Sequence, residues 1–135
     1  MTLAPRGPAD RPLSPFTQVW RWHITMAASI ATRVTGVGLY LGALILAAWA
    51  LSLASGPEAY GTFLAVMGSP LGKFVLFGMT VSFFYHLAGG LRHIVWDLGY
   101  GLNVKSANAM SVASFAFAIA ATLAVWAIAA MTGAL

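Results

Sequence analysis

No charged side chain interrupts residues 106–135, SANAMSVASFAFAIAATLAVWAIAAMTGAL, a stretch of 30 positions. Toward the N-terminus, residues 74–91 form a second uncharged stretch of 18 positions, and residues 34–57 form a third of 24. A membrane-spanning helix needs about 20 residues, because the hydrocarbon core is about 30 Å thick and each residue rises about 1.5 Å. The sequence therefore predicts an all-α integral membrane subunit with three transmembrane helices, at about 29–55, 73–99 and 107–133.

The segments between these spans contain helix breakers. Gly and Pro disfavour the continuation of a helix. We therefore expect breaks at Ser55-Gly56-Pro57, at Gly68-Ser69-Pro70, and around Gly99 and Gly101.

The composition excludes several other classes of protein. Of 135 residues, 60% are hydrophobic and 7% are charged, whereas a soluble domain carries about 25% charged residues. Disorder is excluded, because a disordered chain has low hydrophobicity. The absence of cysteine excludes disulfides, cysteine-ligated zinc and iron–sulfur clusters held by this chain. We attribute the net charge of +4 to membrane topology, and expect contact with lipid and no nucleic-acid partner.

The basic residues predict the orientation, since Lys and Arg mark the cytoplasmic side of a membrane protein. With three spans, six of them fall on one side: Arg6, Arg11, Arg21, Arg33, Arg92 and Lys105. Lys73 falls on the other side, with Glu58. We expect a cytoplasmic N-terminus, a short cytoplasmic and interfacial segment over residues 1–28, and a transmembrane domain over residues 29–135.

One histidine lies inside the second predicted span. His86 follows Lys73 by 13 residues and precedes Arg92 by six, which correspond to about 20 Å and about 9 Å of helix. It is therefore expected in the cytoplasmic half of the bilayer, where a polar residue is a candidate functional residue. A neutral imidazole there can ligate a metal or haem, relay protons, or hydrogen-bond a neighbouring helix.

The neighbours of His86 leave both a cofactor role and a packing role open. Gly89 and Gly90 leave room for a flat macrocycle or for a close helix. Ser82, four residues before the histidine, is placed to orient its ring. His93 follows by seven residues, about 10 Å along the same helix face, and is expected at a haem edge or at the membrane surface.

Those two histidines cannot ligate the same iron. Axial nitrogens lie about 4 Å apart across an iron, given iron–nitrogen bonds of about 2 Å. The first and third predicted spans contain no histidine. A haem held by two histidines therefore implies a second membrane subunit.

Polar residues also cluster where the first predicted span begins. Ser29 and Arg33 are one turn apart and share a helix face. They are placed to bind a haem propionate or a quinone carbonyl; alternatively, Arg33 extends to the lipid headgroups. Arg92 has the same two interpretations. Asp97, near Arg92, His93 and Lys105, is interpreted as part of a local ion pair at the membrane face.

Two motifs carry a family resemblance. The first is RPLSP at residues 11–15, followed by Ser29, Arg33 and Thr35-Gly36. The second is HLAGGLRHIVWDLG, residues 86–99. Together with the three spans and their orientation, they resemble the cytochrome b subunit of succinate dehydrogenase over nearly the whole chain.

The resemblance implies a membrane anchor that passes electrons from succinate oxidation to ubiquinone. One haem b would be shared with a second anchor subunit, with His86 as one axial ligand. Ser29 and Arg33 would line the ubiquinone-reduction site. Arg33, Arg92 and His93 would lie near the haem propionates or the pocket, supported by Ser82, Gly89, Gly90 and Asp97. An iron–sulfur subunit and a flavoprotein subunit would complete the enzyme, with the succinate-oxidising site outside this chain.

The sequence departs from the family pattern at two positions. Thr32 stands where the family usually has a histidine directly before the arginine, and Phe16 replaces another common histidine. The alternative functions are a haem-free structural anchor, a fumarate reductase anchor, and a small proton-relaying transport subunit. The N-terminus does not resemble an Arg- and Ser-rich transit peptide, so we expect a multi-pass protein of the bacterial inner membrane.

Overall fold

A computed structural model describes residues 20–133, which contain four helices and no strand. Helix α2 covers Ile24–Ser55, α3 Pro57–Gly68, α4 Pro70–Asp97 and α5 Val104–Met131. Helices α2, α4 and α5 are long and apolar enough to cross a membrane. The prediction of an all-α protein with three transmembrane helices is confirmed.

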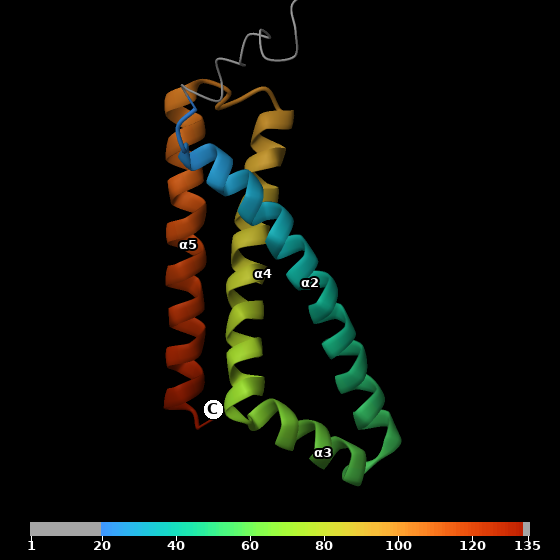
Figure 1. Ribbon diagram of the computed structural model, residues 1–135. Helices are drawn as coiled ribbons and strands as arrows, with labels where there is room; N and C mark the ends of the chain where they lie inside the picture. Colours follow the sequence, from blue (N-terminus) through green and yellow to red (C-terminus); the bar gives the residue numbers. More distant parts are fainter. Residues whose placement is uncertain (1–19, 134–135) are drawn as a thin grey trace, which may run out of the picture.

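The three long helices do not form a uniform bundle. Helices α4 and α5 lie side by side along their length, whereas α2 crosses them obliquely (Figure 1). Helix α2 begins beside α5, crosses α4, and then moves away from it, and the short α3 returns the chain to the start of α4 (Figure 1). Close contact between α2 and α4 is therefore concentrated near the end of the molecule where α2 begins.

Side-chain caps set two of the helix starts earlier than predicted. Ser69 accepts a hydrogen bond from the Gly72 amide at 3.1 Å, so α4 begins at Pro70 instead of residue 73. Asn103 accepts one from the Ser106 amide at 2.9 Å, so α5 begins at Val104 instead of residue 107. Both helices also end two residues earlier than predicted, at Asp97 and Met131.

Helix α2 also begins earlier than the predicted first span. Its start at Ile24 includes residues 24–28, which the sequence analysis assigned to the interfacial segment. The part of that segment before residue 20 lies outside the described residues.

Helix α3 was not predicted. Gly56 has φ +109 and ends α2, as the sequence indicates. Pro57 then occupies the first turn of a new 12-residue helix, with Glu58 beside it. These are favourable residues for a helix start, so Gly56 ends one helix and Pro57 directly after it begins the next.

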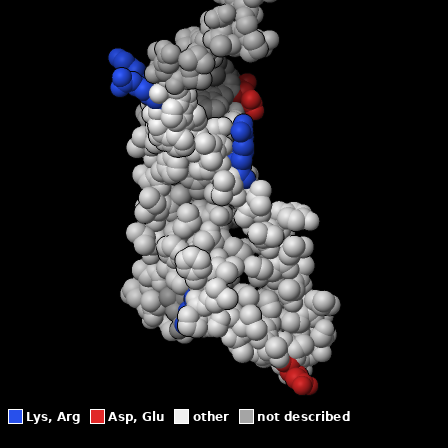
Figure 2. All heavy atoms as spheres, viewed as in Figure 1, with Lys and Arg blue, Asp and Glu red and all other residues white. Residues whose placement is uncertain are grey.

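The described surface has a broad uncharged band between charged groups at its two ends. Asp97 and Lys105 flank the connection between α4 and α5, near the start of α2, whereas Glu58 and Lys73 lie at the α3 end. Arg33, in the first third of α2, is also exposed, and Figure 2 shows an uncharged band between these charged groups and the α3 end. A band of this kind is what a lipid-facing surface requires.

The core is small and largely polar. Only three hydrophobic residues are buried among residues 20–133: Ala28, Tyr85 and Ala118. The buried polar and charged side chains are Thr35, Arg92, Ser111, Ser114 and Thr122. Large apolar side chains cover the outside, as expected when the surrounding solvent is lipid and small or polar residues join the helices.

Candidate functional site

Glycine residues bring α2 and α4 together at their crossing. A Cβ atom added at Gly36 would lie 3.3 Å from His86 Cε1, and one added at Gly38 would lie 3.1 Å from Ser82 Oγ. On α4, a Cβ added at Gly89 would lie 3.3 Å from Thr32 Oγ1. Three points of close approach therefore depend on the absence of a side chain.

The two glycines after His86 have different surroundings. Gly89 is buried against α2, whereas a Cβ added at Gly90 would have no neighbour within 4 Å. Residues four apart share a helix face, so the open face at Gly90 continues from His86. Gly89 serves helix packing, and Gly90 leaves space beside the histidine.

His86 is half-buried at the crossing and contacts α2. Its Nδ1 atom lies 3.3 Å from Thr35 Oγ1. Within residues 20–133, Nδ1 is the ring nitrogen that has a hydrogen-bond partner. Ser82, which we expected to orient the ring, instead donates to the Gly78 carbonyl at 2.8 Å. The hydroxyl at the imidazole therefore belongs to Thr35, which the sequence analysis did not select for this role.

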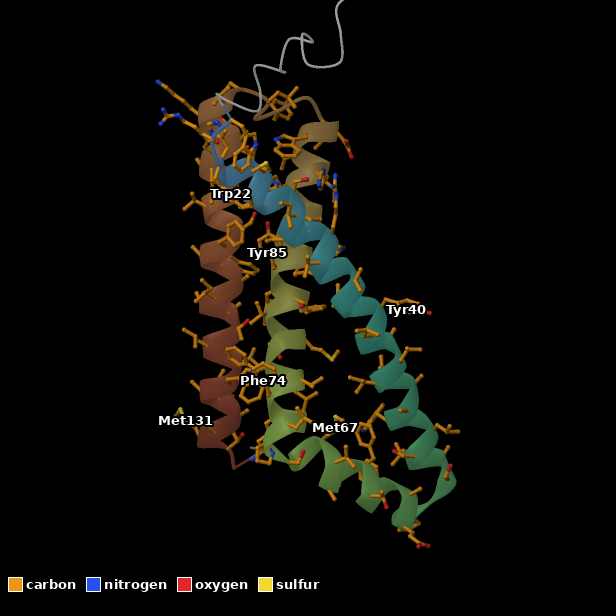
Figure 3. The ribbon with its side chains drawn as sticks, in the orientation of Figure 1. Trp22, Tyr40, Met67, Phe74, Tyr85 and Met131 are labelled. Carbon is orange, nitrogen blue, oxygen red and sulfur yellow. The ribbon has the colours of Figure 1, made fainter. Side chains whose placement is uncertain are left out.

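Tyr85 fixes the start of α2 against the other two helices. It is buried between α4 and α5 (Figure 3) and donates a hydrogen bond to the Ala28 carbonyl at 2.9 Å. Its ring lies 4.7 Å from that of Phe115 on α5. These two contacts of Tyr85 fix the position of the helical turn that contains Ser29 relative to α4 and α5.

A polar cavity of about 230 Å³ opens beside this turn. Its lining contains four of the predicted site residues: Ser29, Arg33, Arg92 and His93. It also contains Thr25, Thr32 and Trp96. Thr25 and Thr32 lie four residues before and three after Ser29, so helical periodicity could have revealed both.

Arg92 crosses the space between α4 and α5. The residue is 5% exposed, and its guanidinium donates from Nη1 to Ser111 Oγ at 3.0 Å and lies 4.9 Å from the centre of the Trp96 ring. The expected ion pair between Arg92 and Asp97 is not formed, and Asp97 is an exposed residue at the end of α4. Ser111 was not predicted, because nothing in its sequence context indicates its partner on α4.

Two buried donors of the cavity-lining residues have no partner among the described residues. They are Arg92 Nε and Trp96 Nε1. A buried cation without a counter-charge is unfavourable unless an acceptor satisfies it. The cavity therefore suits a ligand with carboxylate or carbonyl oxygens.

The described residues do not form a metal site by themselves. Residues 20–133 contain no group of three His, Cys, Asp or Glu side chains that could hold a metal ion. His86 can contribute a single imidazole ligand, next to a cavity that offers several hydrogen-bond donors.

Comparison with known proteins identifies the family. Residues 8–125 match the family described as "Succinate dehydrogenase/Fumarate reductase transmembrane subunit". The chain is 38% identical to a succinate dehydrogenase cytochrome b556 subunit of Paracoccus denitrificans over 107 residues, which cover 79% of this chain and 82% of that protein. It is 34% identical to the protein of the same name from Rickettsia felis over 116 residues, 86% of this chain and 90% of the relative.

A mitochondrial relative is similar at the same level. The succinate dehydrogenase cytochrome b560 subunit of Sus scrofa is 36% identical over 98 residues, 71% of this chain and 58% of that protein. The family match includes both motifs, all of α2 and α4, and α5 as far as residue 125. The chain therefore belongs to the family of succinate dehydrogenase and fumarate reductase transmembrane subunits.

Proposed function

We propose that this chain and a second anchor subunit bind one haem b and form part of the ubiquinone-reduction site of a succinate dehydrogenase. The observation that carries the proposal is the position of His86. Its imidazole is half-exposed at the α2–α4 crossing, with Nδ1 on Thr35 and an open helix face at Gly90. The names of the relatives, cytochrome b556 and b560, support this assignment.

The residues present fit a haem. His86 would hold the iron through Nε2, the ring nitrogen without a hydrogen-bond partner among residues 20–133, and a second ligand would come from the other anchor subunit. Arg33, Arg92 and His93 would hold the propionates or line the adjoining pocket, where Arg92 Nε has no hydrogen-bond partner among the described residues. Haem b, when bound, supplies a one-electron redox centre between the two anchors.

The quinone site uses the polar cavity at the start of α2. Ser29 and Arg33 donate hydrogen bonds to a carbonyl oxygen of ubiquinone, and the guanidinium stabilises the negative charge that develops there during reduction. His93, on the same cavity, holds a proton close to that oxygen. Reduction of the quinone consumes two electrons and two protons.

The partners follow from this division of roles. A flavoprotein subunit oxidises succinate, and an iron–sulfur subunit carries the electrons to the cavity on the cytoplasmic side. The excess of basic residues at the α2 end supports a cytoplasmic N-terminus. Helices α2, α4 and α5 would then anchor the complex in the bacterial inner membrane, with the start of α2 on the cytoplasmic side.

The test is a reduced-minus-oxidised visible spectrum of the detergent-purified complex. We expect a b-type band in the wild type that is lost in His86→Ala, while the subunits still co-purify. His23→Ala is the matched control, because His23 lies directly before α2 and outside the cavity lining, and its removal should leave the band in place.

Other outcomes identify the alternatives. An intact wild-type complex without a b-type band would support a haem-free anchor. A band that persists in His86→Ala would refute the ligand assignment. Failure of the chain to co-purify with a flavoprotein and an iron–sulfur subunit would favour a small proton-relaying transport subunit. Relative rates with succinate and fumarate would separate a dehydrogenase anchor from a fumarate reductase anchor.

A further inference from the structure

We propose that Thr35 is a positioning residue for His86: its hydroxyl fixes the tautomer and the ring orientation in which Nε2 is free to bind iron. This inference rests on the proposed function, because it concerns the same histidine. Neither the two sequence motifs nor the names of the relatives assign a role of this kind to Thr35.

The direction of the hydrogen bond follows from the surroundings of the hydroxyl. Thr35 Oγ1 lies 2.7 Å from the Ala31 carbonyl oxygen, and 3.1 Å from that of Thr32. A carbonyl has no proton, so the contact of 2.7 Å requires the single proton of the hydroxyl. Toward His86 Nδ1, at 3.3 Å, the hydroxyl oxygen is therefore an acceptor. The proton between them belongs to the imidazole.

A neutral imidazole carries one ring proton. If that proton is on Nδ1, the lone pair is on Nε2, the tautomer that binds iron through Nε2. Thr35 is buried, so water does not compete for this contact. Through Thr35, helix α2 therefore determines which ring nitrogen of His86 carries the proton, although the two residues are 51 positions apart in the sequence.

Gly36 holds the same edge of the ring. A Cβ atom at this position would lie 3.3 Å from Cε1 and 3.8 Å from Nδ1. The imidazole thus contacts α2 through its Nδ1–Cε1 edge: Nδ1 donates a hydrogen bond to Thr35, and Cε1 packs closely against Gly36. Two contacts on one edge restrict rotation of the ring about the side-chain bond.

A hydrogen bond from the non-ligating N–H of a histidine raises its basicity as a ligand, and loss of such a partner typically costs about 10- to 100-fold in metal affinity. A more basic ligand favours the ferric state. Removal of the Thr35 hydroxyl should therefore weaken haem binding and raise the midpoint potential. A tenfold change in relative ferric and ferrous affinity corresponds to about 59 mV for one electron.

The experiment compares Thr35→Val with Thr35→Ser in the complete purified complex. Valine has nearly the same shape as threonine but no hydroxyl, and serine retains the hydroxyl. Haem content per complex and the midpoint potential of the b-type band are measured, together with co-purification of the subunits. In Thr35→Val we expect a more positive midpoint potential and a reduced haem content. In Thr35→Ser we expect both quantities to be near their wild-type values.

Two outcomes would overturn the inference. One is a Thr35→Val complex with wild-type potential and haem content. The other is an equal shift in both variants, which would indicate packing and not the hydroxyl. The His86→Ala spectrum separates this failure from a failure of the proposed function, since only the latter leaves the b-type band independent of His86.

Discussion

Replacement of Ser111 by alanine should destabilise the packing of α4 on α5 through Arg92. Ser111 has 0% exposure, so neither water nor a lipid headgroup can replace its hydroxyl as the acceptor for Arg92 Nη1. A hydrogen bond to a charged group contributes about 1.5–3 kcal/mol. Alanine offsets up to about 0.7 kcal/mol of this by its higher helix propensity. Ser111→Ala should therefore lower the free energy of unfolding by about 1–2 kcal/mol.

The assay is a double-mutant cycle on the assembled complex. Unfolding in detergent is titrated with SDS and followed by tryptophan fluorescence, for Ser111→Ala, Arg92→Met and the double variant. Because Arg92→Met removes the donor, Ser111→Ala should cost less than about 0.5 kcal/mol in that background. The cycle also cancels the helix-propensity term.

Ser114→Ala provides the matched control. Ser114 is also buried on α5, but its hydroxyl donates to the Met110 carbonyl of its own helix. Its replacement should change the free energy of unfolding by less than that of Ser111. Equal losses from Ser111→Ala in the wild-type and Arg92→Met backgrounds would refute the reasoning, since the serine would then act independently of the guanidinium.

Three further predictions concern the cavity and the helix crossing. Tyr85→Phe removes the hydrogen bond to the α2 backbone but retains the ring, and should lower the unfolding free energy by about 0.5–1.5 kcal/mol in the same titration. Arg33→Lys should raise the KM for ubiquinone about tenfold, or ~1.4 kcal/mol, while Arg21→Lys, outside the cavity, should leave it unchanged. Gly89→Val should separate α2 from α4 and raise that KM, whereas Gly90→Val should leave the α2–α4 contact intact and instead lower haem content.

Charge and hydropathy determine the spans, because lipid excludes charged groups over a fixed thickness. The helix boundaries depend on finer signals. Ser69 and Asn103 cap their helices through single hydrogen bonds, and each moves a boundary by three residues. Helix α3 was missed because Pro57 serves both as a helix breaker and as a favourable first-turn residue.

The candidate site was likewise predicted in part: the sequence groups residues on one helix, but it does not show contacts between helices. Ser29 and Arg33 can be grouped by helical periodicity, and motif spacing groups Arg92 with His93, but the single cavity depends on how α2 crosses α4. The partner of a buried hydroxyl on another helix is not available from periodicity. For that reason Ser82, on the same helix as His86, was preferred to Thr35.

The glycine contacts at the crossing have a consequence for the register between α2 and α4. Both helices are apolar over most of their length, so hydrophobic burial hardly distinguishes one axial position from another. Gly36, Gly38 and Gly42 form notches on α2 that accommodate His86, Ser82 and Met79 in turn. A slip of one helical turn, about 5.4 Å, would place Tyr40 or Thr32 where the Gly36 notch now receives the imidazole. These glycine contacts thus fix the axial position of α4 relative to α2, and with it the depth of His86 in the bilayer.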